Sequence, residues 1–171
     1  MLSSFEEKIL LSRLIPRPKK AVFEDGFFRL ENGCRVVLAV PGELVPLLQK
    51  RFAAYWNVAP EIVREEEVAA DEEAYRLDIL PGCLRIECAS SLALNHALHT
   101  LRQWAEPLPG TARLTGYQLP CGRIEDAPEI HFRGVHFCMF PETNPADLEK
   151  KIRLAAYWKL RYLVLEFWGT F

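Results

Sequence analysis

Three side chains in the last third of the sequence have types and positions that suit ligand binding: Arg133, Glu166 and Trp168. Arg133 lies inside the apolar segment HFRGVHF, where its guanidinium could bind paired ligand oxygens or form a structural ion pair with a carboxylate. Glu166 and Trp168 lie at the end of the apolar run YLVLEF, and α/β sheets and barrels hold their sites at the carboxyl ends of parallel strands. An acid beside an aromatic ring suits a sugar, although the same pair also fits plain packing and an ion pair. We predict these three residues as substrate-binding residues.

No set of residues typical of a self-contained catalytic site is present. The sequence lacks a glycine-rich phosphate loop, H-E-x-x-H and G-x-S-x-G. Glu125 and Asp126 are neighbouring carboxylates, but neighbours on an extended segment point to opposite sides, which favours a linker or capping role. We therefore expect no catalytic residue and no cofactor in this chain.

A metal site built on histidines is a weaker interpretation. His96 and His99 are three residues apart on a predicted helix and could both reach an ion, with His131, His136 or Cys138 completing the site. Polar residues on a helix surface explain the two helical histidines better. We therefore expect no metal site.

Composition and charge exclude several kinds of partner. The 171 residues are 50% apolar and carry 21 basic and 23 acidic side chains, a net charge of −2. This gives neither the low apolar content of a disordered chain nor the positive field that holds nucleic acid or an anionic bilayer. The first residues carry Glu6 and Glu7 where an export signal would be basic, and later apolar stretches are far shorter than the ~20 residues of a membrane span. We expect no nucleic-acid or membrane partner.

The cysteines favour a reducing compartment. They are odd in number, scattered and without a C-x-x-C pair, which is typical of buried free thiols: Cys34, Cys83, Cys88, Cys121 and Cys138. We therefore predict a cytoplasmic location, although a piece of an exported protein could look the same.

Residues 1–125 are predicted to form an α+β domain in which two helices cover one sheet. A short helix is expected within residues 1–14, and the acidic stretch 65–73 is expected to be a solvated loop or edge. The other expected elements, in chain order, are strands at 22–23, 27–30 and 35–40 with hairpin turns at Asp25-Gly26 and Asn32-Gly33, a helix from Pro46 to Trp56, a hairpin at 75–88 around Pro81-Gly82, a helix from Ser90 to Glu106, and a short strand at 117–120.

Residues 126–171 change character and predict a βαβ unit. A strand at 131–138 precedes a helix start at Asn144-Pro145, and YLVLEF at 162–167 is nearly continuous apolar sequence, as in a parallel strand covered on both faces. Two parallel strands under one helix leave open edges and an apolar face, so something else should cover them. Self-association through this open edge is one possibility.

Six segments in order resemble the β-N-acetylhexosaminidases of glycoside hydrolase family 20. They span residues 14–168: LIPRPK (14–19), YRLDI (75–79), ALHTLRQ (97–103), LPCGRIEDAP (119–128), FRGV (132–135) and KLRYLVLE (159–166). The resemblance implies that residues 1–125 are the family's non-catalytic α+β domain. It implies that residues 126–171 are the incomplete start of a (β/α)8 catalytic barrel.

The resemblance also implies roles for individual residues. Arg133 matches the arginine that holds hydroxyls of a terminal N-acetylhexosamine, and a glycan containing that sugar would be the partner. Family members cleave with the substrate's own acetamide, oriented by an Asp beside an acidic Glu. That Asp–Glu pair would lie beyond Phe171, so this chain alone is expected to be inactive.

The sequence departs from the family pattern inside the matched region. Cys138 stands where many members have Asp, Glu166 and Val164 stand where they have two histidines, and Gly169 replaces an Asp of the site. The parent protein could therefore differ in sugar specificity or in activity. The alternative hypothesis is a stand-alone interaction or carbohydrate-binding module without catalysis.

Overall fold

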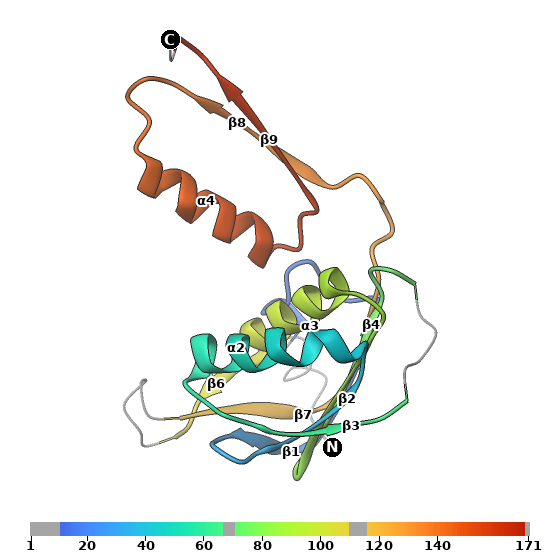
Figure 1. Cartoon of the computed structure of the whole chain (residues 1–171). Helices are drawn as coiled ribbons and strands as arrows, with labels where there is room; N and C mark the ends of the chain where they lie inside the picture. The colour runs from blue at the N-terminus through green and yellow to red at the C-terminus, as the bar shows by residue number, and fades with distance from the viewer. Residues whose placement is uncertain (1–10, 67–70, 110–115, 170–171) are drawn as a thin grey trace. The chain divides into compact units, whose positions relative to one another are not determined.

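The computed structural model describes residues 11–66, 71–109 and 116–169, and it divides into two compact units, Met1–Ala127 and Pro128–Phe171 (Figure 1). The helix expected within residues 1–14 lies mostly outside the described residues. In the described part of the chain, no helix is both long enough and apolar enough to cross a bilayer.

The first unit is a mixed sheet with helices on one of its faces (Figure 1). The helices are η1 (Gly42–Leu44, a 3-10 helix), α2 (Val45–Trp56) and α3 (Ser91–Trp104). The strands are β1 (Lys20–Leu30), β2 (Arg35–Ala39), β3 (Glu61–Arg64), β4 (Tyr75–Leu80), β5 (Cys83–Cys88), β6 (Glu106–Pro107) and β7 (Tyr117–Asp126). Their order across the sheet is β1-β7-β4-β5-β2-β3, with β6 beside β7.

The core of this unit lies between α2, α3 and the facing side of the sheet. Both helices bury an apolar stripe of the kind that a 3.6-residue period predicts. The stripes meet alternate residues of the central strands, all of them essentially inaccessible to water: Leu48 and Phe52 of α2, Leu94, Leu98 and Leu101 of α3, Leu77 and Ile79 of β4, and Leu84 and Ile86 of β5. The predicted α+β layer with two covering helices is thus confirmed.

Two predicted hairpins are wrong. Asp25-Gly26 does not turn the chain back; it lies within β1, where the pairing with β7 shifts register between Phe23 and Phe27. Asn32-Gly33 does end β1, but β1 pairs with β7 and β2 pairs with β3 and β5. Gly26 and Gly33 do have the positive φ that is typical of turn residues. This local signal does not select the partner strand, because β1 pairs with β7, about a hundred positions further along the chain.

The acidic stretch is exposed as predicted at Glu65, Glu66, Asp71 and Glu72, and residues 67–70 lie outside the described residues, but its last residue and the two helical histidines are buried. Glu73, assigned to a solvated loop, is 2% exposed, and its carboxylate Oε2 lies 3.2 Å from His96 Nε2 of α3. His96 and His99 are themselves buried rather than on a helix surface. Just before the acidic stretch, β3 (Glu61–Arg64) was not predicted, and it pairs in parallel with β2 at the edge of the sheet.

The second unit contains the βαβ arrangement predicted from the sequence (Figure 1). Its elements are β8 (Gly134–Met139), α4 (Pro145–Tyr157) and β9 (Tyr162–Phe167). The α4 helix begins at Asn144, whose side-chain oxygen accepts a hydrogen bond from Ala146 N at 2.9 Å. The two strands are parallel, with Gly134 opposite Tyr162 and Met139 opposite Phe167.

Candidate functional site

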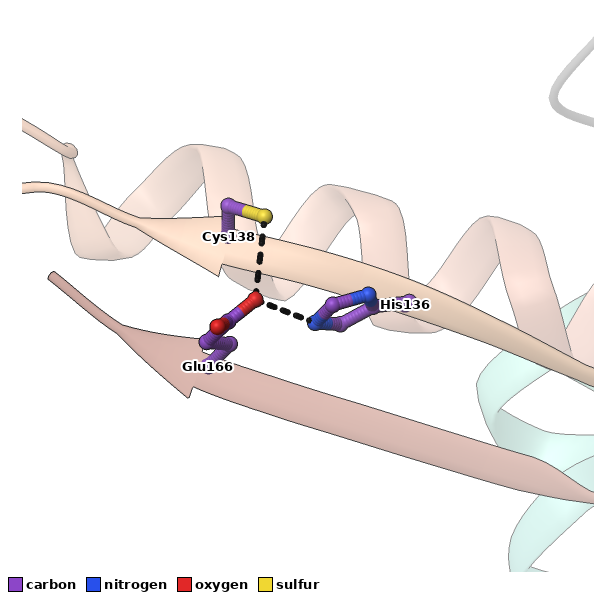
Figure 2. Close-up of side chains that lie close together, drawn as sticks. All are labelled: His136, Cys138 and Glu166. Atoms are coloured by element: carbon purple, nitrogen blue, oxygen red, sulfur yellow. Dashed lines mark hydrogen bonds and ion pairs between the residues drawn. The ribbon is translucent and has the colours of Figure 1, made fainter.

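Three polar side chains of the second unit converge at the paired strands: His136, Cys138 and Glu166 (Figure 2). His136 Nε2 lies 2.9 Å from Glu166 Oε2, and the Cys138 thiol donates to the same oxygen at 3.6 Å. The three ligand-type atoms lie within 4.8 Å of one another. The cluster therefore offers a nitrogen, a sulfur and an oxygen donor around one point.

The strand register explains why these residues meet. Cys138 is directly opposite Glu166, and His136 lies two residues before Cys138, on the same side of β8. The intervening residues Val135 and Phe137 are half-buried, whereas His136 and Cys138 are exposed. Figure 2 shows the three side chains on the side of the strands away from α4. The cluster thus stands on the open face of the unit, toward the carboxyl ends of the strands.

The electrostatic environment keeps Cys138 protonated. Partial desolvation, the hydrogen bond to Glu166 and the negative charge of that carboxylate raise the pKa of the Cys138 thiol, while a hydrogen bond from the Trp168 side chain lowers it. A nucleophilic cysteine requires the thiolate, which a lowered pKa would favour. The raised pKa therefore disfavours a nucleophilic role for Cys138 at neutral pH.

Of the predicted binding residues, Glu166 and Trp168 lie together near Cys138. Trp168 follows β9, and its backbone N donates to Met139 O at 2.8 Å. Its side chain is 53% exposed and interacts with the Cys138 thiol. An exposed aromatic ring and a carboxylate are thus adjacent on one end of the two-stranded sheet.

Arg133 lies at the opposite end of the same sheet. Its Nη1 donates to Ile130 O at 2.6 Å, and its Nε approaches Lys159 O at 3.4 Å. Its own carbonyl accepts from the backbone N of Tyr162, at the start of β9. Arg133 is five positions before Cys138, a span of about 16 Å along an extended chain. The structure therefore does not bring Arg133 into contact with Glu166 or Trp168.

From the sequence, His136 and Cys138 were candidate metal ligands only together with the two histidines of α3, His96 and His99. Those histidines belong to the first unit, where His96 pairs with Glu73. Glu166 was not connected to either residue, because the sequence predicts the parallel pairing of the two strands but not the register that sets Cys138 opposite Glu166. The available signal was the alternation of His136 and Cys138 on one predicted strand, with an acid on the next.

Solved structures with the same fold are glycoside hydrolases. The N-acetyl-β-hexosaminidase of Streptomyces plicatus, in complex with Thio-NAglucal, is 22% identical with a TM-score of 0.73, over 91% of this chain and 34% of that chain. The exo-β-N-acetylglucosaminidase of Vibrio harveyi, in complex with N-acetylglucosamine, is 21% identical with a TM-score of 0.71, over 90% of this chain and 25% of that chain.

The family itself follows from the sequence of the first unit. Residues 11–127 match the model of "Glycosyl hydrolase family 20, domain 2", so the chain belongs to glycosyl hydrolase family 20. The β-N-acetylhexosaminidase of Cellulomonas fimi is 35% identical over 111 residues, which is 63% of this chain and 22% of that protein. The resemblance seen in the sequence is thus confirmed. The chain spans about a fifth to a third of the length of these relatives.

Proposed function

We propose that this chain is the N-terminal part of a glycoside hydrolase that acts on terminal N-acetylhexosamine residues. The observation that carries the proposal is the family match over residues 11–127. The likeness of fold to hexosaminidases extends over 91% of the chain, including residues of the second unit. In this proposal residues 1–125 form the non-catalytic domain, and residues 126–171 begin the (β/α)8 catalytic domain.

The chain alone is expected to be catalytically inactive. Glycoside hydrolysis in most families needs two carboxyl groups that flank the scissile bond, and this family replaces one of them by the substrate's acetamide. The acetamide must also be oriented by an Asp beside the acidic Glu, whereas the neighbours of Glu166 in the sequence are Leu165 and Phe167 and its side chain contacts a histidine and a cysteine. Turnover of an aryl N-acetylglucosaminide by the purified chain should therefore equal the buffer blank. Turnover that the Glu166→Gln variant abolishes would contradict the proposal.

Sugar contact is assigned to the end of the second unit where Trp168 and Glu166 are adjacent. The exposed indole offers an apolar plate for a sugar ring, and the carboxylate can accept from hydroxyls. Arg133 could join such a site only if its guanidinium left the carbonyls of Ile130 and Lys159. Calorimetry with N-acetylglucosamine should show heat that Trp168→Ala removes, and an undiminished heat in that variant would exclude this assignment.

A second candidate function is interaction through the second unit. Its strand β9 exposes a third or more of the side chains of Leu163, Leu165 and Phe167. Exposed apolar groups of this density mark surfaces that associate. Light scattering should then show a dimer whose population grows with concentration. A monomer at every concentration would exclude self-association.

The cytoplasmic location stays a prediction.

A further inference from the structure

We propose that His136, Cys138 and Glu166 bind one divalent transition-metal ion of the zinc type. The ion would take His136 Nε2, Cys138 Sγ and Glu166 Oε2 as ligands. This inference goes beyond the glycosidase proposal and does not rest on it. It also departs from our expectation, drawn from the sequence, that the chain has no metal site.

The donor atoms lie at separations close to those around a tetrahedral zinc ion. Zinc binds sulfur at about 2.3 Å and nitrogen or oxygen at about 2.0–2.2 Å, so donors around a tetrahedral ion lie about 3.4–3.6 Å apart. The observed separations are 2.9 Å for His136 Nε2 to Glu166 Oε2 and 3.6 Å for Cys138 Sγ to the same oxygen, with all three atoms within 4.8 Å. Small side-chain rotations are enough to bring the three donors to tetrahedral spacing.

The paired strands β8 and β9 fix the backbone positions of the three donor residues. All three side chains project from one face of two directly paired strands, so their Cα positions are set by backbone hydrogen bonds rather than by a loop. Sites built on strands hold their geometry better than sites on loops. The side chains of His136 and Glu166 are 51% and 42% exposed, which leaves them free to adjust and leaves the ion a path of entry.

The chemistry of the donor set selects the ion. A thiolate and an imidazole favour zinc and its neighbours in the transition series over magnesium and calcium, which prefer oxygen ligands. Three protein ligands leave a fourth position for water or another ligand. Binding would replace the thiol proton of Cys138 by the metal, so that one proton leaves to solvent for each ion bound.

Cobalt(II) and zinc titrations of the 171-residue chain test the proposal. The chain is first treated with a chelator, dialysed, and kept reduced with a phosphine. Cobalt(II) should bind at one ion per chain, with a sulfur-to-cobalt charge-transfer band in the near ultraviolet and the visible bands of a tetrahedral site. Zinc should displace it. Absence of a charge-transfer band at saturating cobalt would overturn the proposal.

Ligand variants and matched controls assign the site. Cys138→Ser should abolish the charge-transfer band, and His136→Ala and Glu166→Gln should each weaken zinc binding by about tenfold or more. Cys83→Ser and His131→Ala, which change a thiol and an imidazole elsewhere in the chain, should leave both readouts unchanged. Equal losses in the controls, or none in the ligand variants, would contradict the assignment.

A measurement on the unaltered chain guards against variants that fail to fold. Zinc should slow the alkylation of Cys138 by iodoacetamide, followed peptide by peptide by mass spectrometry, and should leave the rate at Cys83 unchanged. Equal rates at Cys138 with and without zinc would exclude a metal–thiolate bond there.

Discussion

Gly122 of β7 lies opposite Phe23 of β1, where the two backbones leave no room for a side chain. Its φ is +152°, and a Cβ built on it would lie 2.3 Å from the backbone oxygen of Val22. That contact can be relieved only by moving the backbone, because the contacted atom is a backbone oxygen and not the end of a flexible side chain. We expect Gly122→Ala to lower the free energy of unfolding by about 3 kcal/mol or more.

Urea unfolding followed by circular dichroism measures this effect. Gly82 in the β4–β5 turn is the matched control, because a Cβ there meets nothing within 4 Å. Gly82→Ala should change the free energy of unfolding by less than about 1 kcal/mol. Similar values for the two variants would show that the β1–β7 approach is not the constraint.

Because of its buried thiols, the first unit should lose stability as the pH rises into the alkaline range. Burial raises the pKa of Cys88 from 9.0 to about 12. Between these values the unfolded chain releases the proton and the folded chain keeps it, so stability is complete below pH 9 and falls as pH rises. The fall is at most about 1.4 kcal/mol per pH unit for this thiol. Burial also raises the pKa of Tyr75, of Cys34 and of Cys121, with the same sign.

Urea unfolding at pH 8.5–10.5 separates the contribution of Cys88 from those of the other groups. Cys88→Ala should make the dependence on pH less steep. Ile86→Val, on the same strand and equally buried, should lower stability without changing that dependence. An unchanged slope in Cys88→Ala would be evidence that this thiol ionises in the folded chain as it does in the unfolded one.

At the scale of elements, Ser90 connects the start of α3 to the chain that precedes it. Its Oγ accepts from Ala93 N at 3.0 Å and donates to the carbonyl of Glu72. We expect Ser90→Ala to cost about 1–2 kcal/mol of the free energy of unfolding, since both bonds are lost. Ser90→Asp can still accept from Ala93 but cannot donate, so it should recover part of the loss.

Thermal and urea unfolding of these variants measure the contribution of the cap. Ser91→Ala is the control, because Ser91 is an exposed residue one position further along. It should change stability by less than about 0.5 kcal/mol. A loss as large as that of Ser90→Ala would mean that the sequence of the first turn, rather than the cap, sets the stability of α3.

Elements with a clear local period were predicted well, and elements with distant partners were not. The hairpin at 75–88 and the helix α3 follow from alternation and from a 3.6-residue stripe, both of which involve neighbours in sequence. The strand β7 was predicted to stop at Pro120, yet it continues to Asp126 between β1 and β4. Its second half has little periodicity of its own, and it is a strand because β1 and β4 pair with it on both sides.

At the scale of the whole molecule, the two units differ in how completely they bury apolar groups. The core of the first unit is closed within residues 14–124, whereas Leu163, Val164 and Phe167 of the second unit are each more than a third exposed. A piece of about 44 residues also buries a small fraction of its surface. We expect residues 1–127 alone to unfold cooperatively and residues 128–171 alone to show no cooperative transition.

Circular dichroism of the two fragments in urea tests this difference. The first fragment should give a sigmoidal curve, and the second should change gradually. A sigmoidal curve for residues 128–171 that does not depend on concentration would contradict the prediction. A curve that shifts with concentration would instead support self-association of the second unit.

The sequence by itself determined the α+β layer, the βαβ unit and the family, because local periods and ordered motifs are properties of neighbouring residues. Only the tertiary structure decided three other features. It paired β1 with β7, from Lys20 opposite Glu125, and it buried Glu73 against His96. It also brought His136, Cys138 and Glu166 to one point. Each of these contacts joins residues more than twenty positions apart, and the free energy that selects such a partner comes from the packed whole rather than from any local pattern.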